Sequence, residues 1–202
     1  PLGYEQSVCK AMRAKGIDCF FFDEPKEYRT QLRKASLLFY YNRISREIFH
    51  RIFWRVIAQP LQKLLIDTAL KNNVDYVFVS KGLFLHPSTI VTLQGHNISV
   101  SCYYADNPFN TWHFTNSNTW VRESIKLYDT YLAWAKFLIP QLKAYGAKSV
   151  HYIPYACNPD VHYPVSVKKY EREKFGSDVA FIGTADEERI HFFSEFIKMT
   201  FF

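Results

Sequence analysis

Short apolar runs alternate with helical patterns along most of this 202-residue chain. Uninterrupted apolar runs are typical of strands buried on both faces, and a helix between successive strands is typical of a parallel sheet. The pattern predicts an α/β fold in which a parallel sheet carries helices on both faces. Strands are expected at residues 17–22, 74–79, 97–104, 130–133 and 150–153, and helices at 4–15, 42–73 with a new start at Pro60, 87–94, 121–128 and 137–145.

A proline-rich segment follows the strand expected at 150–153. Pro154, Pro159 and Pro164 lie within eleven residues of one another. Because proline fixes φ and removes a backbone donor, these residues exclude regular helix or sheet there. A charged and solvated segment, 168–174, comes next. The segment therefore predicts a boundary between two domains.

An apolar run at 179–182 stops at Gly183 and is followed by a helix signal with acidic residues in its first turn. A strand that turns on a glycine into a polar helix start is how an α/β domain begins. We expect a first domain (1–165), a linker (166–177) and the first strand and helix of a second α/β domain (178–202). Because the sequence opens on Pro-Leu-Gly and stops on two phenylalanines, it is interpreted as a trimmed piece of a longer chain.

The composition is that of a soluble globular protein, with 48% hydrophobic residues and a net charge of +6. No apolar run approaches the roughly 18 residues of a membrane-spanning helix, and no signal peptide is visible. The four cysteines are scattered and include no Cys-x-x-Cys pair, which favours reduced thiols and a cytoplasmic location. They are Cys9, Cys19, Cys102 and Cys157.

The residues directly after each strand are the candidate binding residues, because ligands bind beyond the carboxyl ends of parallel strands. Here they combine polar groups that bind hydroxyls with aromatic rings that pack on the apolar side of a sugar. The predicted substrate-binding set is Lys81, Gly82, Asp106, Asn107, Tyr155 and Asn158, and Asp23, Glu24, Ser80 and Trp134 also follow strands. A simpler interpretation stays open for Asp106, because Asp-Asn-Pro is also a favourable turn.

Two side chains are candidates for proton transfer, Asp106 and His113. His113 lies in an Asn-rich segment, where a loop beside the strand end would place it over the cleft as a proton acceptor. The alternative is a solvated loop histidine. The chain contains no Asp-x-Asp, and its seven histidines are isolated, so no metal is predicted.

Residues 43–58 predict an amphipathic helix with a basic face. Arginines and one tryptophan recur at helical spacing on one side, and apolar residues fill the other. Two interpretations remain open: a basic face that is simply solvated, which is favoured, or a peripheral contact with anionic lipid, a lipid-linked acceptor or nucleic acid. Nucleic acid is not expected as a partner.

Four stretches resemble a known family. They are residues 3–7 running through 16–18, the strand end Tyr-Tyr-Ala-Asp-Asn-Pro (103–108), Tyr-Ile-Pro (152–154) with 158–164, and Asp-Val-Ala-Phe-Ile-Gly-Thr (178–184) with Arg189. Together they resemble the N-terminal half of a GT-B type glycosyltransferase, most closely the spore-maturation-protein CgeB-like group. The resemblance covers nearly the whole chain through short, degenerate motifs.

This resemblance implies transfer of a sugar from a nucleotide-sugar donor to a glycan, protein or lipid-linked acceptor, between two Rossmann-like domains. The N-terminal domain would hold the acceptor, and Gly183, Thr184 and Arg189 would face the donor. Arg189 is equally interpreted as a surface residue. No cofactor is expected besides the nucleotide-sugar, and a departing diphosphate would be stabilised by helix dipoles and basic side chains.

A second class of function stays open, namely a binding module without chemistry. The chain lacks Gly-x-Ser-x-Gly, the Gly-x-x-x-x-Gly-Lys-Ser/Thr phosphate loop and Gly-x-Gly-x-x-Gly. Hydrolase, P-loop and dinucleotide oxidoreductase functions therefore lack their motifs. The donor, the acceptor and the stereochemical outcome do not follow from the sequence.

Overall fold

The computed structural model describes residues 3–35, 58–110, 116–183 and 185–200. The chain forms two compact units, Pro1–Val161 and His162–Phe202. The first unit ends four residues before the domain boundary expected at 165. The helix expected at 42–57, including most of the basic segment 43–58, lies outside the described residues, as do His113 and Thr184.

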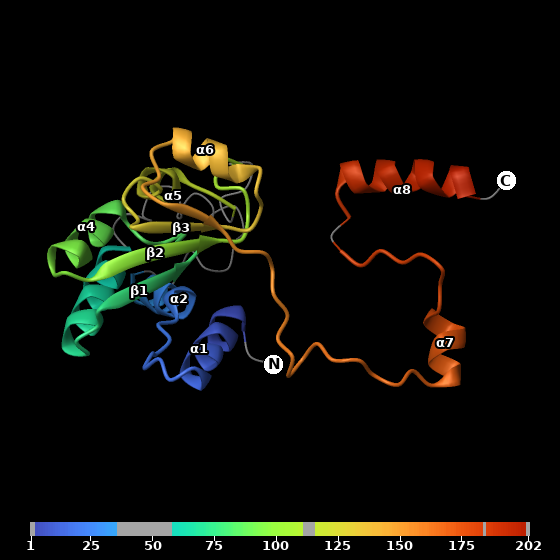
Figure 1. The fold of residues 1–202 in the computed structure, drawn as a ribbon, viewed down its shortest axis with the longest axis horizontal. Coiled ribbons are helices and arrows are strands. Elements are labelled where there is room, and N and C mark those ends of the chain that lie inside the picture. Colours follow the sequence, from blue (N-terminus) through green and yellow to red (C-terminus); the bar gives the residue numbers. More distant parts are fainter. Residues whose placement is uncertain (1–2, 36–57, 111–115, 184, 201–202) are drawn as a thin grey trace. The chain divides into compact units, whose positions relative to one another are not determined.

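Four parallel strands form one sheet in the first unit, in the order β1-β2-β3-β4 (Figure 1). The predicted α/β fold class is confirmed, and each of these strands starts within two residues of its expected position. The register pairs Ser80 with Tyr103 and Tyr104 with Ala133, so the C-terminal ends of β1, β2 and β3 are neighbours. The strands are β1 (Tyr76–Ser80), β2 (Ser99–Tyr104), β3 (Thr130–Ala133) and β4 (Val150–Tyr152).

One helix separates each strand of the sheet from the next, as expected for parallel crossovers. Residues 58–71 are helical and precede β1. The other helices are α1 (Tyr4–Ala14), α2 (Glu24–Ala35), α4 (Pro87–Gly95), α5 (Thr119–Ser124) and α6 (Leu138–Ala144). The sequence patterns did not predict α2, which is rich in charged residues and contains few apolar residues.

Several helices stop at a residue in the left-handed conformation. In α1 the N–H of Gly16 (φ 79°) donates to the Arg13 carbonyl, and the N–H of Ile17 donates to the Met12 carbonyl. This is the Schellman arrangement, which satisfies carbonyls at the helix end and reverses the chain. The same pair of bonds follows the helix at 58–71, α4 and α6, with Asn73, Asn97 and Gly146 at the left-handed position.

Residues 17–22 do not form the expected strand. Ile17 is 52% exposed, and its N–H is bonded to the end of α1. The Cys19 carbonyl accepts from Arg13 Nε, and the Phe22 carbonyl accepts from the N–H of Glu24. The backbone groups of this apolar run therefore form hydrogen bonds with nearby residues and do not pair with a strand of the sheet.

The main hydrophobic core lies on one face of the sheet. Val100, Cys102 and Tyr104 alternate along β2 toward this face and are fully buried. Side chains of the helix at 58–71, α4, α5 and α6 pack against them, among them Ala69, Ile90, Leu93, Val121, Ile125, Leu138 and Leu142. Because side chains alternate along a strand, Ser80, Ser101 and Tyr103 belong to the opposite face. There the first turn of α1 contacts β1 and β2 through Glu5 and Tyr4.

The second unit contains α7 (Lys169–Phe175) and α8 (Glu187–Thr200). The prediction of a strand at 179–182 is wrong. These residues pair with no strand in the described part of the chain, and Ile182 is 97% exposed. The expected linker, 166–177, contains α7, whose start is capped by the Glu171 carboxylate on the N–H of Lys168 (2.8 Å). The predicted helix is present as α8, and Asp186 caps it by accepting from the N–H of Arg189.

Candidate functional site

An ion pair between Lys81 and Asp106 joins the ends of β1 and β2. Ser80 and Tyr103 are register partners, so the residues that follow these two strands leave the sheet side by side. The N–H of Lys81 continues the ladder by donating to the Tyr103 carbonyl (3.0 Å). Both charged side chains are partly exposed, at 30% and 42%. The strand ends therefore present a cation and an anion to solvent at a fixed position.

Aromatic rings flank this ion pair. The hydroxyl of Tyr155 donates to the carbonyl of Ala105, directly before Asp106. The ring of Tyr155 lies 5.3 Å from that of Trp134, which follows β3. Burial raises the pKa of Tyr155, and the neighbouring Asp106 charge raises it further. Tyr155 therefore stays protonated and keeps its hydrogen bond at neutral pH.

The first turn of α1 adds two side chains that sequence reasoning missed. Tyr4 stacks on Tyr103, with 5.7 Å between ring centroids. Burial, followed by the effect of Tyr103, raises the pKa of Tyr4 to about 12. Glu5 accepts a hydrogen bond from Ser80 Oγ at 3.0 Å. No strand-end pattern would have found Tyr4 or Glu5, because neither follows a strand.

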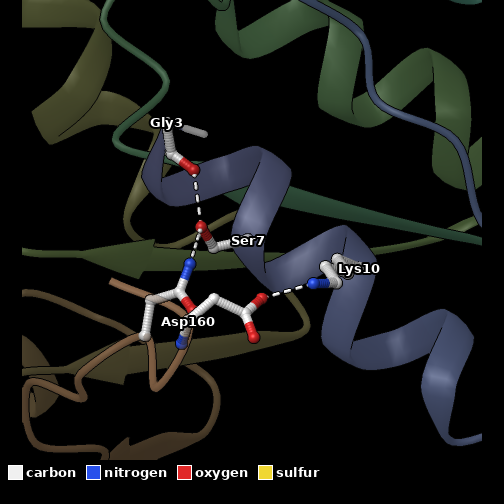
Figure 2. A network of polar contacts seen from close by, with 5 residues as sticks. Gly3, Ser7, Lys10 and Asp160 are labelled. Atoms are coloured by element: carbon white, nitrogen blue, oxygen red, sulfur yellow. Dashed lines mark hydrogen bonds and ion pairs between the residues drawn. The ribbon is translucent and has the colours of Figure 1, made fainter. Parts of the chain in front are cut away.

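Figure 2 shows how α1 is attached to residues 158–161, which follow β4. Ser7 Oγ accepts from Asn158 Nδ2 at 3.0 Å and donates to the Gly3 carbonyl at 2.9 Å. One turn later, Lys10 forms an ion pair with Asp160. Asn158, predicted to bind substrate, thus uses its amide to hold α1. Its Oδ1 accepts from the N–H of Asp160, which closes a local turn.

Gly82 occupies a position that no other residue fits. Its φ is 67°, and an added Cβ would lie 2.8 Å from Val79 Cγ1 and 3.1 Å from the hydroxyl of Tyr128. The role of Gly82 in this structure is therefore close packing of the loop after β1. Asn107 also supports a turn, since its Oδ1 accepts from the N–H of Phe109 at 2.9 Å.

A half-buried acid lies beside this loop. The carboxyl group of Glu24, at the start of α2, accepts a hydrogen bond from the N–H of Phe84, and burial raises its pKa to about 8. It lies close enough to Cys102 and Tyr128 to raise the pKa of both groups. Strongly shifted carboxyl groups occur both at functional sites and in structural networks.

A cavity of about 340 Å³ lies at the start of α4. Gln62 ties its walls together: Nε2 donates to the Phe84 carbonyl (2.7 Å), and Oε1 accepts from the N–H of His86 (3.0 Å) and from Thr89 Oγ1 (2.8 Å). The ring of His86 meets Trp120 edge-on at 4.7 Å. The lining residues are Ala58, Gln59, Gln62, His86, Ser88 and Trp120.

The residues expected to face a donor belong to the second unit. Arg189 pairs with Asp186, with 3.1 Å between Nη1 and Oδ2, and its guanidinium lies over the ring of Phe181. A Cβ added to Gly183 would meet the same ring at 2.6 Å. Both residues therefore contribute to the local packing at the start of α8.

Three further observations bear on function. In the described ranges, no group of three or more His, Cys, Asp and Glu side chains is placed to hold a metal ion. Over the same ranges, no helix has both the length and the apolar character needed to cross a bilayer. Comparisons with protein-family models, curated proteins and solved structures found no match for this chain. Its function is therefore inferred from the strand-end residues themselves.

Proposed function

We propose that this protein is part of a glycosyltransferase that moves a sugar from a nucleotide-sugar donor to an acceptor. The first unit binds the acceptor in this proposal. The observation that carries this proposal is the Lys81–Asp106 ion pair with Tyr155 and Trp134 beside it, at the C-terminal edge of a parallel sheet. Charged groups bind sugar hydroxyls and aromatic faces cover the apolar side of a sugar ring, so the two together suit a carbohydrate acceptor.

In this proposal Asp106 accepts the proton of the attacking acceptor hydroxyl, and Lys81 orients the carboxylate. The acceptor oxygen forms a bond to the anomeric carbon as the bond from that carbon to the diphosphate breaks, and the nucleoside diphosphate departs. Basic side chains and helix N-termini stabilise the departing charge without a metal. We place the reaction in the cytoplasm, because all four cysteines of the chain are free thiols in this structure.

A thermal-shift panel of UDP, GDP, CDP and dTDP sugars, measured in EDTA on the full-length gene product, tests the proposal, because residues 1–202 alone are expected to be inactive. We expect one nucleotide-sugar to raise the melting temperature and to release its nucleoside diphosphate when candidate acceptors are added. Stabilisation by a sugar acceptor without nucleotide release would support the alternative, a binding module. A panel with neither a shift nor a release would contradict the proposal.

A further inference from the structure

Two cysteines that are ten positions apart in the sequence touch in the structure. The Sγ atoms of Cys9, on α1, and Cys19, in the segment that follows it, are 3.2 Å apart. Each thiol also approaches the other residue's carbonyl, at 3.4 and 3.7 Å. Both residues are half-buried, whereas Cys102 is buried in the core and Cys157 is exposed. The two cysteines are scattered in the sequence, and only the fold brings their sulfur atoms together.

The fold holds the pair in place from both sides. The Schellman turn at Gly16 reverses the chain, so residues 17–19 run back along α1. Arg13 Nε then donates to the Cys19 carbonyl at 2.8 Å and fixes that residue against the helix. A disulfide has an S–S distance of about 2.05 Å, so the two sulfur atoms need to approach by about 1 Å. Rotation about the cysteine χ1 angles supplies movements of this size.

We propose that Cys9 and Cys19 are a redox-active dithiol that forms a reversible intramolecular disulfide by exchange with a small-molecule disulfide such as oxidised glutathione. One cysteine thiolate attacks the reagent, forms a mixed disulfide and releases one glutathione thiol. The second cysteine thiolate attacks the mixed disulfide and releases the other. The two protein thiols lose two protons and two electrons, and the reagent becomes two thiols.

The disulfide would tie α1 to the segment that leads into α2. That helix carries Tyr4 and Glu5 to the strand ends, and Ser7 and Lys10 flank Cys9 on it. Oxidation would therefore restrain the helix that covers the ends of β1 and β2. This inference rests on the thiol geometry and is independent of the proposed transferase activity.

The test measures the equilibrium constant for disulfide formation in glutathione redox buffers, with the folded chain and with the chain unfolded in urea. Cys157→Ser serves as the background, because it removes the exposed thiol. Trypsin cleaves after Lys10, Arg13 and Lys15, so Cys9 and Cys19 fall on separate peptides that stay linked only when the disulfide is present. We expect the constant to be at least about 10-fold larger in the folded chain, because the fold brings the thiols together.

Equal constants in the two states, or free alkylation of both thiols in the folded chain across all buffers, would overturn the proposal. Cys9→Ser and Cys19→Ser are the matched controls, since each leaves one member of the pair. Either variant should form only the mixed disulfide with glutathione and no linked peptides. In the Cys157→Ser background, hydrogen exchange of α1 should slow on oxidation and return to its starting rate on reduction.

Discussion

The backbone N–H of Phe84 donates a hydrogen bond to the carboxyl group of Glu24. Phe84 belongs to the loop that follows β1, and Glu24 begins α2, so this bond fixes α2 beside the C-terminal end of the sheet. The contact is reinforced by Tyr28, one turn along α2, whose ring stacks on that of Phe84 at 4.0 Å. The loop that carries Lys81 and Gly82 is thereby held by a group whose protonation changes near neutral pH.

Glu24→Gln should change how stability depends on pH. Burial raises the pKa of Glu24 from 4.5 to about 8 in the folded protein, so between these values the folded state holds a proton that the unfolded state has released. The stabilisation of the folded state by the protonated Glu24 carboxyl is therefore fully present below pH 4.5 and is lost as pH rises toward about 8. Each unit of pKa shift corresponds to about 1.4 kcal/mol in the free energy of unfolding. Urea unfolding at several pH values should show the variant gaining stability relative to the natural protein as pH rises. Glu27→Gln, on the same helix, should track the natural protein, and equal behaviour of both variants would contradict the assignment.

Gln62→Met should destabilise the first unit strongly. It removes the amide that bonds to the Phe84 carbonyl, the N–H of His86 and the hydroxyl of Thr89, leaving three partly buried polar groups without this partner. The expected loss in the free energy of unfolding is about 2 to 4 kcal/mol. Gln59→Met is the matched control, because that residue is exposed and its change should stay within about 0.5 kcal/mol. Chemical denaturation measures both, and equal losses would show that the Gln62 bonds contribute little.

Asp129→Asn should cost stability at neutral pH and much less in acid. Burial opposes ionisation of Asp129, but hydrogen bonds from the N–H of Val100, from Gln94 and from Lys148 outweigh it and lower the pKa. The stabilisation is present above the ordinary value of 3.8 and is lost as pH falls through the lowered pKa. At pH 7 we expect a loss of about 1 to 3 kcal/mol, measured by urea unfolding. Asp67→Asn, on an exposed helix face, should change stability little at either pH.

Alternation of apolar and helical segments was enough to predict the sheet, because each strand from β1 to β4 is an apolar run with a helix before the next. The same signal failed at residues 17–22 and 179–182. An apolar run forms a strand only when a neighbouring strand accepts its hydrogen bonds, and that neighbour is not encoded in the run itself. The charged helices α2 and α7 were not predicted, because they contain few apolar residues.

The strand-end rule located Lys81, Asp106 and Tyr155 in one cluster, because the ends of neighbouring parallel strands meet at one edge of the sheet. The same rule did not identify Tyr4, and it predicted substrate binding for Asn158, whose amide donates a hydrogen bond to Ser7 on α1. The position of Tyr4 depends on contacts between α1 and residues that follow β4, such as the bond from Asn158 to Ser7. No local pattern reveals a contact between segments separated by 151 positions.

Asp106→Asn tests the proposed chemistry against a matched ion pair. Asp106 pairs with Lys81, and Asp160 pairs with Lys10, so both carboxylates belong to partly exposed lysine ion pairs in the first unit. Such pairs contribute about 0 to 1 kcal/mol to stability, and neither Asp106→Asn nor Asp160→Asn should shift the melting temperature by more than a few degrees. Loss of a proton acceptor should lower the rate of nucleotide release by about 100-fold or more in Asp106→Asn alone. Equal activity of the two variants, with the donor-induced thermal shift intact, would remove Asp106 from the reaction and leave it as a member of the Lys81 ion pair.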